Sequence, residues 1–235
     1  MSASSPLLLA LHSSSETLAL GLQPLGLQPL CLQPIGLQPL APAEALPPPR
    51  LAAFPLGREL SRELLPCLEQ LLPAAQWPRL ARLVVALGPG GFTGTRLTVV
   101  LARTLAQQLD IPLHGYSSFL LMARRLAAPA GPMAGCSRFW LQQELPRRGC
   151  VAGQYGPDPR VFGGMAELQP PRLFPVAEPL PWLADAPQPV LPAQVLPEAD
   201  AAELLALGQL AHAAGLSGPW GPVLPLYPTS PVEGL

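Results

Sequence analysis

The sequence predicts an α/β fold. Two uninterrupted apolar runs, at residues 7–11 and 83–87, have the length and composition of buried strands. Two segments with leucines at helical spacing, 58–72 and 95–109, follow these runs along the chain. Strands that alternate with amphipathic helices are typical of a sheet covered by helices.

The chain begins with a predicted hairpin. The apolar run 7–11 is followed by a polar turn, His12 to Ser15, and residues 17–22 have the pattern of a second strand. A polar turn between two apolar runs indicates that these strands pair with each other.

A five-residue repeat follows the hairpin. Gly21-Leu-Gln-Pro-Leu25 recurs, with small changes, as residues 26–30, 31–35 and 36–40. A proline in every unit blocks a helix and removes donors from a sheet. We therefore interpret the repeat and the proline-rich residues up to Pro49 as a surface insertion produced by tandem duplication.

Two helices flank a predicted strand and a glycine-rich turn at 88–94. Leucines on one face define the helix at 58–72, with Ser61 as its expected N-cap and Pro66 near its first turns. The helix at 95–109 is expected to bury Leu97, Val100 or Leu101, Leu105 and Leu109.

The rest of the chain continues the α/β pattern less regularly. The predicted elements are a strand at 112–116, a helix at 118–127, paired strands at 139–144 and 150–155, a helix at 199–214 and an extended tail at 223–231. Residues 156–197 contain many prolines and few periodic segments, so no element is predicted there.

The composition excludes several kinds of chemistry. The 235 residues include no lysine, so the chain has neither a Walker A phosphate site nor a Schiff base. A net charge of −1 gives no general attraction to nucleic acid or anionic lipid. The 4 cysteines are widely spaced, and they fit neither a zinc site nor a disulfide framework. No apolar stretch approaches the ~20 residues of a membrane span, and no signal peptide is recognisable, so we expect a cytoplasmic protein.

One segment resembles a known family. Gly88-Pro-Gly-Gly-Phe-Thr-Gly-Thr-Arg96 is closely similar to the G-P-G-S-F-T-G-x-R signature of the TsaB (YeaZ) family, the dimerisation subunit of the bacterial tRNA threonylcarbamoyladenosine system. Ser61-Arg-Glu-Leu-Leu-Pro66 and Asp110-Ile-Pro-Leu-His-Gly-Tyr-Ser-Ser118 also match family patterns, and residues 51–125 carry most of the resemblance. His12 stands where the family usually has aspartate, Gly91 replaces the signature serine, and Leu145 replaces a later aspartate.

The resemblance implies an architecture. It predicts two ribonuclease H-like lobes of the actin-like ATPase (ASKHA) superfamily, with the second lobe reduced. The N-terminal lobe would cover residues 1–117, with the repeat insertion at about 21–49. The reduced C-terminal lobe would cover residues 118–235 and include the proline-rich segment.

The resemblance also implies two sets of site residues. The signature loop comprises Gly88, Pro89, Gly90, Gly91, Phe92, Thr93, Gly94 and Arg96. In the family the two helices of the N-terminal lobe contact the catalytic subunit TsaD. This places the interface on Ser61, Leu64, Leu65, Leu68, Leu72, Val99, Val100 and Arg103. Without the resemblance, the apolar residues of these two helices indicate ordinary helices that pack on the core.

The signature loop leaves two interpretations open. Its flexible glycines before a helix suit an anion, but the spacing is not G-x-G-x-x-G and no P-loop lysine follows. We favour a tight structural turn with Phe92 buried beneath it. Arg96 lies near the helix N-terminus, where a cation is unfavourable, which indicates either a carboxylate partner or a solvated face.

No catalytic or metal-binding residue is predicted. His12, His114 and His212 are far apart in sequence, and no pair has ligand spacing. No G-x-S-x-G motif marks a nucleophile. The arginine pairs Arg124-Arg125 and Arg147-Arg148 are candidates for phosphate contact, although solvated residues are the default interpretation.

The resemblance therefore implies a non-catalytic scaffold. The chain would pair with a TsaD-type catalytic subunit for threonylcarbamoylation of the adenosine next to the anticodon in tRNAs that read A-starting codons. A TsaE-type ATPase would be a further partner, tRNA would be reached through the complex, and no cofactor is assigned to this chain, although ATP in the complex stays open. The alternatives are a degenerate nucleotide-binding or peptidase-like enzyme of the same superfamily, or a homodimer formed through the same helices.

Overall fold

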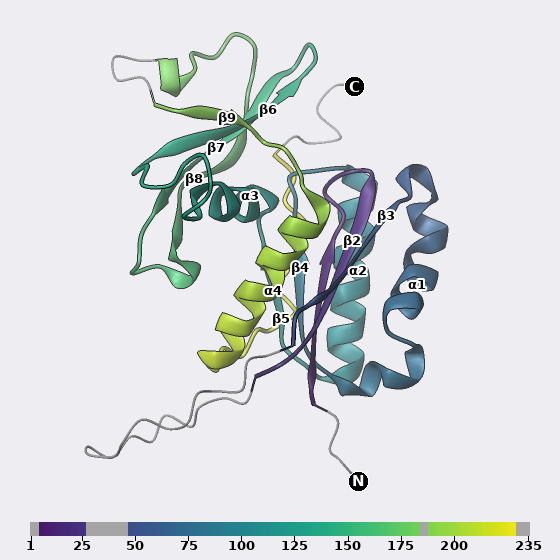
Figure 1. Ribbon diagram of the computed structural model, residues 1–235. Helices are drawn as coiled ribbons and strands as arrows, with labels where there is room; N and C mark the ends of the chain where they lie inside the picture. The colour runs from purple at the N-terminus through teal and green to yellow at the C-terminus, as the bar shows by residue number, and fades with distance from the viewer. Residues whose placement is uncertain (1–4, 27–46, 184–187, 229–235) are drawn as a thin grey trace, which may run out of the picture.

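The computed structural model describes residues 5–26, 47–183 and 188–228 and confirms the α/β prediction (Figure 1). A five-stranded sheet has the order β3-β2-β1-β4-β5, and a four-stranded sheet has the order β8-β7-β6-β9. The first sheet contains β1 (Leu7–His12), β2 (Thr17–Pro24), β3 (Arg50–Pro55), β4 (Leu80–Ala86) and β5 (Leu113–Tyr116). The second contains β6 (Phe139–Leu145), β7 (Gly149–Pro157), β8 (Met165–Phe174) and β9 (Val190–Pro192). The helices are α1 (Leu60–Leu71), α2 (Phe92–Leu109), α3 (Ser118–Ala127) and α4 (Pro197–Ala213).

Strand β1 lies at the centre of the first sheet. It pairs antiparallel with β2, as the hairpin prediction requires, and parallel with β4. Leu9 and Leu11 pack into the core beneath α1 and α2, whereas Leu8 and Ala10 pack on the opposite face. Because both faces are covered, every residue of the strand is buried, which explains its uninterrupted apolar sequence.

Helix α4 covers the second face of this sheet, although it comes from the end of the chain. Figure 1 shows α4 on one side of the sheet and α1 and α2 on the other. Leu204, Leu205 and Leu207 pack against Leu8 in this second core. A Cβ at Gly208 would lie 2.8 Å from the Leu8 side chain, so glycine allows α4 to approach the sheet closely.

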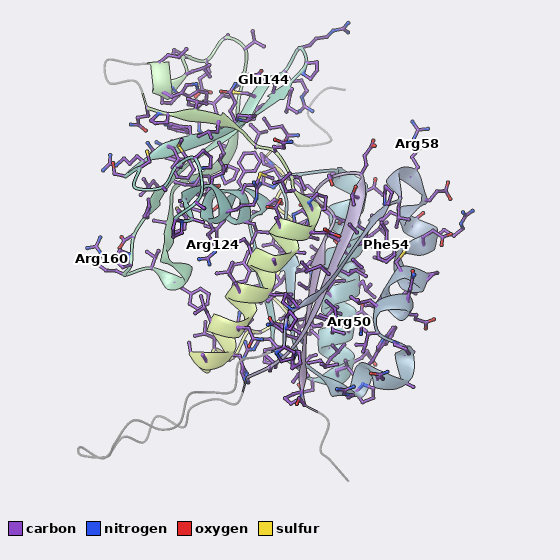
Figure 2. The ribbon with its side chains drawn as sticks, viewed as in Figure 1. Arg50, Phe54, Arg58, Arg124, Glu144 and Arg160 are labelled. Atoms are coloured by element: carbon purple, nitrogen blue, oxygen red, sulfur yellow. The ribbon has the colours of Figure 1, made fainter. Side chains whose placement is uncertain are left out.

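The second sheet has two apolar faces. Phe119 and Met122 of α3 pack against one face, together with Tyr155. On the other face, the Trp182 ring lies 4.7 Å from Trp140 and 5.3 Å from Phe174, measured between ring centroids. Figure 2 shows the dense packing of side chains between the elements. Among the described helices, none is long and apolar enough to cross a membrane.

The structure corrects the predicted start and buried face of two helices. Helix α1 begins at Leu60, so Ser61 lies inside it and the expected Ser61 N-cap is wrong. Helix α2 begins at Phe92 rather than residue 95, which places Arg96 in its second turn. The buried residues of α2 are Thr95, Thr98, Val99, Ala102, Leu105 and Ala106. Small side chains let the helix lie close to the sheet, so Leu97, Leu101 and Leu109 are only partly buried and Val100 is exposed.

Three strands, β3, β8 and the short β9, were not predicted. Strand β3 is an edge strand whose residues are mostly half-buried or exposed, so its sequence has no clear apolar run. Strand β8 contains Pro170 and Pro171, which disfavour a central strand but are tolerated at the edge of a sheet. The first repeat unit begins within β2, which continues to Pro24; residues 27–46, with the other units, lie outside the described residues.

Candidate functional site

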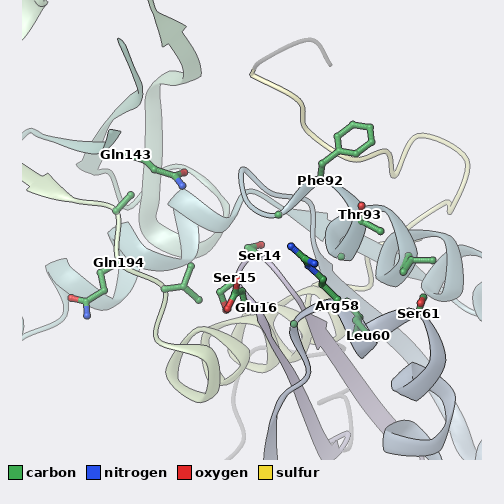
Figure 3. Close-up of a pocket in the computed structure, with 16 residues that line it drawn as sticks. Ser14, Ser15, Glu16, Arg58, Leu60, Ser61, Phe92, Thr93, Gln143 and Gln194 are labelled. Atoms are coloured by element: carbon green, nitrogen blue, oxygen red, sulfur yellow. The ribbon is translucent and has the colours of Figure 1, made fainter. Parts of the chain in front are cut away.

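A cleft of about 820 Å³ lies between the two sheets, at the carboxyl end of β1 and the N-terminus of α2 (Figure 3). One wall is formed by Arg58, Ser61 and Thr93, and the opposite wall by Gln143 and Gln194. Ligands of open α/β sheets bind beyond the carboxyl ends of parallel strands. Both parallel strands β1 and β4 end near this cleft, which makes it the candidate site of the chain.

The glycine loop joins three elements by close backbone approach. A Cβ at Gly90 would lie 2.4 Å from the carbonyl oxygen of Ser14, and one at Gly94 would lie 3.1 Å from that of Ser13. Gly88 has a φ of 92°, which favours glycine, and its carbonyl accepts the Ser118 N–H at 2.7 Å. The loop therefore packs the β1–β2 turn against the starts of α2 and α3, as the structural interpretation of the signature requires.

The expected burial of Phe92 is wrong. The side chain is 42% exposed, and its ring centroid lies 4.7 Å from that of Tyr227. Because α2 starts at Phe92, this side chain leaves the first turn toward the C-terminal segment instead of toward the core, and it also lines the cleft.

Serines at the end of β1 have partners within the protein. Ser13 Oγ lies 2.8 Å from Thr98 Oγ1, and Ser14 Oγ lies 2.6 Å from Ser118 Oγ. These bonds connect the turn to α2 and α3. They occupy the two hydroxyls, so the arrangement positions helices and does not present an activated nucleophile.

His12 does not provide a metal site. Its ring is fully buried, and neither ring nitrogen has a hydrogen-bond partner among the described residues. Burial lowers the pKa of His12 to about 4, so the ring is neutral at neutral pH. Of the cleft-lining residues that the structure describes, Glu16 is the one carboxylate. A single carboxylate and a buried neutral ring do not fit the metal ion of a bound nucleotide, which prefers several oxygen ligands.

The predicted interface residues divide into two groups. Leu64, Leu68, Leu72 and Val99 are buried in the core between the helices and the first sheet, so a partner cannot contact them directly. Ser61, Leu65, Val100 and Arg103 keep accessible side chains, and Leu65 and Val100 are 50% and 54% exposed. Of the predicted interface, these four residues have side chains that a partner could reach, and the interface itself stays a prediction.

The two arginine pairs have different surroundings. Arg124 pairs with Glu203 at 2.9 Å, and Arg125 pairs with Asp200 at 2.9 Å, so both connect α3 to α4. Arg147 and Arg148 are exposed in the turn between β6 and β7. The first pair has a structural role that its spacing on α3 did not reveal.

The C-terminal segment, which the sequence predicts only as an extended tail, contacts α2 at two places. Residues 216–228 run beside α2, where Trp220 lies under the Arg103 guanidinium at 5.5 Å from Cζ to the ring centroid. Tyr227 contacts Phe92 at the other end of the segment. The sequence predicted an extended tail here, and Pro225-Leu-Tyr227 resembles the family's terminal P-x-Y pattern, but neither signal predicted the contacts with α2.

Known proteins share parts of this sequence and its fold. A family model described as TsaD, tRNA N6-adenosine threonylcarbamoyltransferase, matches residues 49–134. The tRNA threonylcarbamoyladenosine biosynthesis protein TsaB of Bacillus subtilis is 52% identical over 44 residues, which is 19% of this chain and 19% of that protein. The match thus spans about a fifth of the length of the curated relative.

Two solved structures from Pseudomonas aeruginosa share the fold over nearly the whole chain. An uncharacterised protein with similarity to peptidase YeaZ has a TM-score of 0.65 at 22% identity, and the alignment covers 95% of this chain and 100% of that one. YeaZ itself has a TM-score of 0.63 at 22% identity, with 94% and 99% covered. The chain is thus similar to TsaB over a short stretch of sequence, and it shares its fold with the YeaZ structures.

Proposed function

We propose that the chain is an accessory subunit in tRNA threonylcarbamoyladenosine formation, and that it pairs with a TsaD-type catalytic subunit. The observation that carries this proposal is the 52% identity to TsaB over 44 residues, together with the glycine loop that packs the start of α2 against the β1–β2 turn. A TsaD-type subunit would transfer the threonylcarbamoyl group to the adenosine next to the anticodon of tRNAs that read A-starting codons. This chain would hold that subunit in its working conformation.

The local chemistry supports a non-catalytic role. Ser13 and Ser14 bond to neighbouring helices, and His12 is buried and neutral. Among the described residues that line the cleft, Glu16 is the one carboxylate, so they offer no pair of carboxylates for general acid and base catalysis. The described part of this cleft therefore offers neither paired carboxylates nor a serine free of other bonds at the end of β1.

The architecture and the remaining partners belong to the same proposal. Two ribonuclease H-like lobes, residues 1–117 and 118–235, would correspond to the two sheets, although α4 from the second lobe packs on the first sheet. Contact with the catalytic subunit would use Ser61, Leu65, Val100 and Arg103. A TsaE-type ATPase would join the complex, tRNA would be bound through the catalytic subunit, and the complex would act in the cytoplasm.

Purified subunits test the proposal. The chain and the TsaD-type subunit of the same genome, mixed and separated by size, should elute together as one complex. Separate elution at micromolar concentrations would contradict the proposal. Calorimetric titration of the isolated chain with ATP tests the enzymatic alternative, for which the cleft of about 820 Å³ is the favourable observation. Tight ATP binding by this chain alone would favour that alternative.

A further inference from the structure

A second pocket lies at the edge of the first sheet. It has a volume of about 260 Å³ and separates the edge strand β5 from the C-terminal segment, residues 216–228. We name it the edge pocket; residues 113–116 and Leu87 line one side, and Gly218, Pro219, Pro222 and Val223 line the other. None of these residues lines the cleft at the end of β1, so the edge pocket is a separate cavity.

Backbone groups of β5 point out of the sheet toward this pocket. The carbonyls of Pro112 and Tyr116 both accept N–H groups from the β4 side at 2.9 Å. In a parallel pair the bonding residues alternate along the strand, so the N–H and carbonyl groups of Leu113 and Gly115 point away from β4. The Leu113 N–H agrees with this direction, because it donates to the Gly218 carbonyl at 2.8 Å.

The other groups on this edge are open to a ligand. Among the described residues, the Gly115 N–H, the Gly115 carbonyl and the Leu113 carbonyl have no hydrogen-bond partner on this side of β5. Such unpaired edge groups are a template for hydrogen bonding by another molecule. Gly115 presents a donor and an acceptor side by side, and the two carbonyls outnumber the one N–H. A complementary ligand therefore carries an acceptor next to an N–H-rich group such as an amino group.

The side chains of the pocket are uncharged at neutral pH. Burial, and after it the nearby Arg82 guanidinium, lower the pKa of His114 to about 4, while burial raises the pKa of Tyr116 to about 12. Arg82 donates to Nε2 of His114, and since a guanidinium has no acceptor, the ring proton lies on Nδ1. The other lining residues that the structure describes are glycines, prolines and aliphatic residues. A neutral ligand fits this lining better than a phosphate or a carboxylate.

The C-terminal segment limits the length of the occupant. It is hydrogen-bonded to the sheet at both ends of the pocket, from the Leu113 N–H to the Gly218 carbonyl and from the Leu226 N–H to the Leu87 carbonyl, at 2.8 Å and 2.7 Å. An extended peptide therefore cannot continue along β5. Pockets for drug-sized molecules measure about 300–1,000 Å³, so the edge pocket admits one compact ring system.

We propose that the edge pocket binds the amino-substituted base of a free nucleoside, adenosine or cytidine. The amino group of the base would donate to the Gly115 carbonyl, and the adjoining ring nitrogen would accept the Gly115 N–H. The His114 and Tyr116 rings, near-parallel at 16° with centroids 6.5 Å apart, supply aromatic contact area. This inference goes beyond the proposed function and does not rest on it, because it concerns this chain alone.

Nuclear magnetic resonance of the whole chain tests the inference without any substitution. The chain is labelled with ¹⁵N-glycine and titrated with adenosine and with cytidine, and the assigned Gly115 amide resonance should shift with concentration. N6,N6-dimethyladenosine keeps the ring and lacks the amino hydrogens, so it leaves the Gly115 carbonyl unpaired and should bind about tenfold more weakly or worse. An unshifted Gly115 amide at millimolar concentrations of both nucleosides would overturn the inference, as would equal affinity for the dimethylated analogue.

A matched pair of variants locates the bound nucleoside. Pro222 is exposed on the wall of the pocket, so Pro222→Phe fills the pocket and should weaken adenosine binding about tenfold or more. Leu224 does not line the pocket and is 54% exposed, so Leu224→Phe adds the same ring outside it and should bind like the wild type. Thermal unfolding confirms that both variants are folded. Wild-type affinity of folded Pro222→Phe would place the nucleoside elsewhere and overturn the inference.

Discussion

The Nε of Arg125 donates a hydrogen bond to Oδ1 of Asp200 over 2.9 Å, and the Asp200 side chain is fully buried. The other carboxylate oxygen accepts the Leu196 N–H at 2.9 Å, and Arg125 also donates to the Gln194 carbonyl at 2.8 Å. This pair therefore ties α3, which covers the second sheet, to the start of α4, which covers the first.

Loss of the Asp200 carboxylate should destabilise the protein. Asp200→Ala leaves the partly buried guanidinium and the Leu196 N–H without their acceptor, so we expect the free energy of unfolding to fall by about 2 kcal/mol or more. Urea unfolding measures the change. Arg62→Ala, which breaks an exposed pair with Glu59, is the control and should change the free energy by less than about 1 kcal/mol. If Asp200→Ala and Arg62→Ala lower the free energy of unfolding by the same amount, the buried pair stabilises the protein no more than the exposed pair does.

Gly90 and Gly91 should respond differently to the same substitution. An added Cβ at Gly90 would lie 2.4 Å from the Ser14 carbonyl oxygen, whereas one at Gly91 meets nothing within 4 Å. Gly90→Ala should therefore lower the thermal midpoint of unfolding by several degrees, since about 1 kcal/mol corresponds to roughly 2–4 °C in a chain of this size. Gly91→Ala and Gly91→Ser should leave the midpoint nearly unchanged. A harmless Gly90→Ala would contradict the close approach of the loop to the β1–β2 turn.

His12 should make stability depend on pH. Burial lowers its pKa from 6.5 to about 4, so below pH 6.5 the unfolded chain binds a proton that the folded chain does not. Stability is therefore full above the unfolded pKa and falls as the pH drops through this window, by at most about 3 kcal/mol from this residue. His12→Leu should flatten the dependence measured by urea unfolding between these two pH values. A slope identical to that of the wild type would contradict the buried neutral ring.

Leu65 and Leu68 on α1 should separate binding from stability. Leu68 is fully buried, so Leu68→Ala should lower the free energy of unfolding by about 2–5 kcal/mol. Leu65 is 50% exposed, so Leu65→Ala should change stability little and weaken binding to the TsaD-type subunit. Isothermal calorimetry and urea unfolding of both variants check this. An effect of Leu65→Ala on stability alone would remove α1 from the predicted interface.

The sequence predicted an element correctly where the local pattern of apolar residues matches the burial of that element in the fold. The run at 7–11 is apolar at every position because helices cover both faces of β1, and the predicted helix at 118–127 coincides with α3. Glycines at 88–94 also predicted a tight turn, because the backbone there approaches Ser13 and Ser14.

Other features depend on contacts between distant segments. Nothing in residues 50–55 indicates a strand, since β3 is defined by its pairing with β2 and its side chains stay largely exposed. The buried face of α2 was misjudged because threonines and alanines, not leucines, lie nearest the sheet. The Arg125–Asp200 pair joins residues 75 positions apart, and no local spacing predicts it.

The most direct test of the account is the threonylcarbamoyladenosine content of tRNA in a reconstituted reaction. The mixture contains the TsaD-type and TsaE-type subunits, the activated threonylcarbamoyl donor and unmodified tRNA, and mass spectrometry of digested tRNA measures the modified nucleoside. The account predicts abundant modification when this chain is present and very little when it is omitted. Equal modification with and without the chain would contradict its role as the accessory subunit.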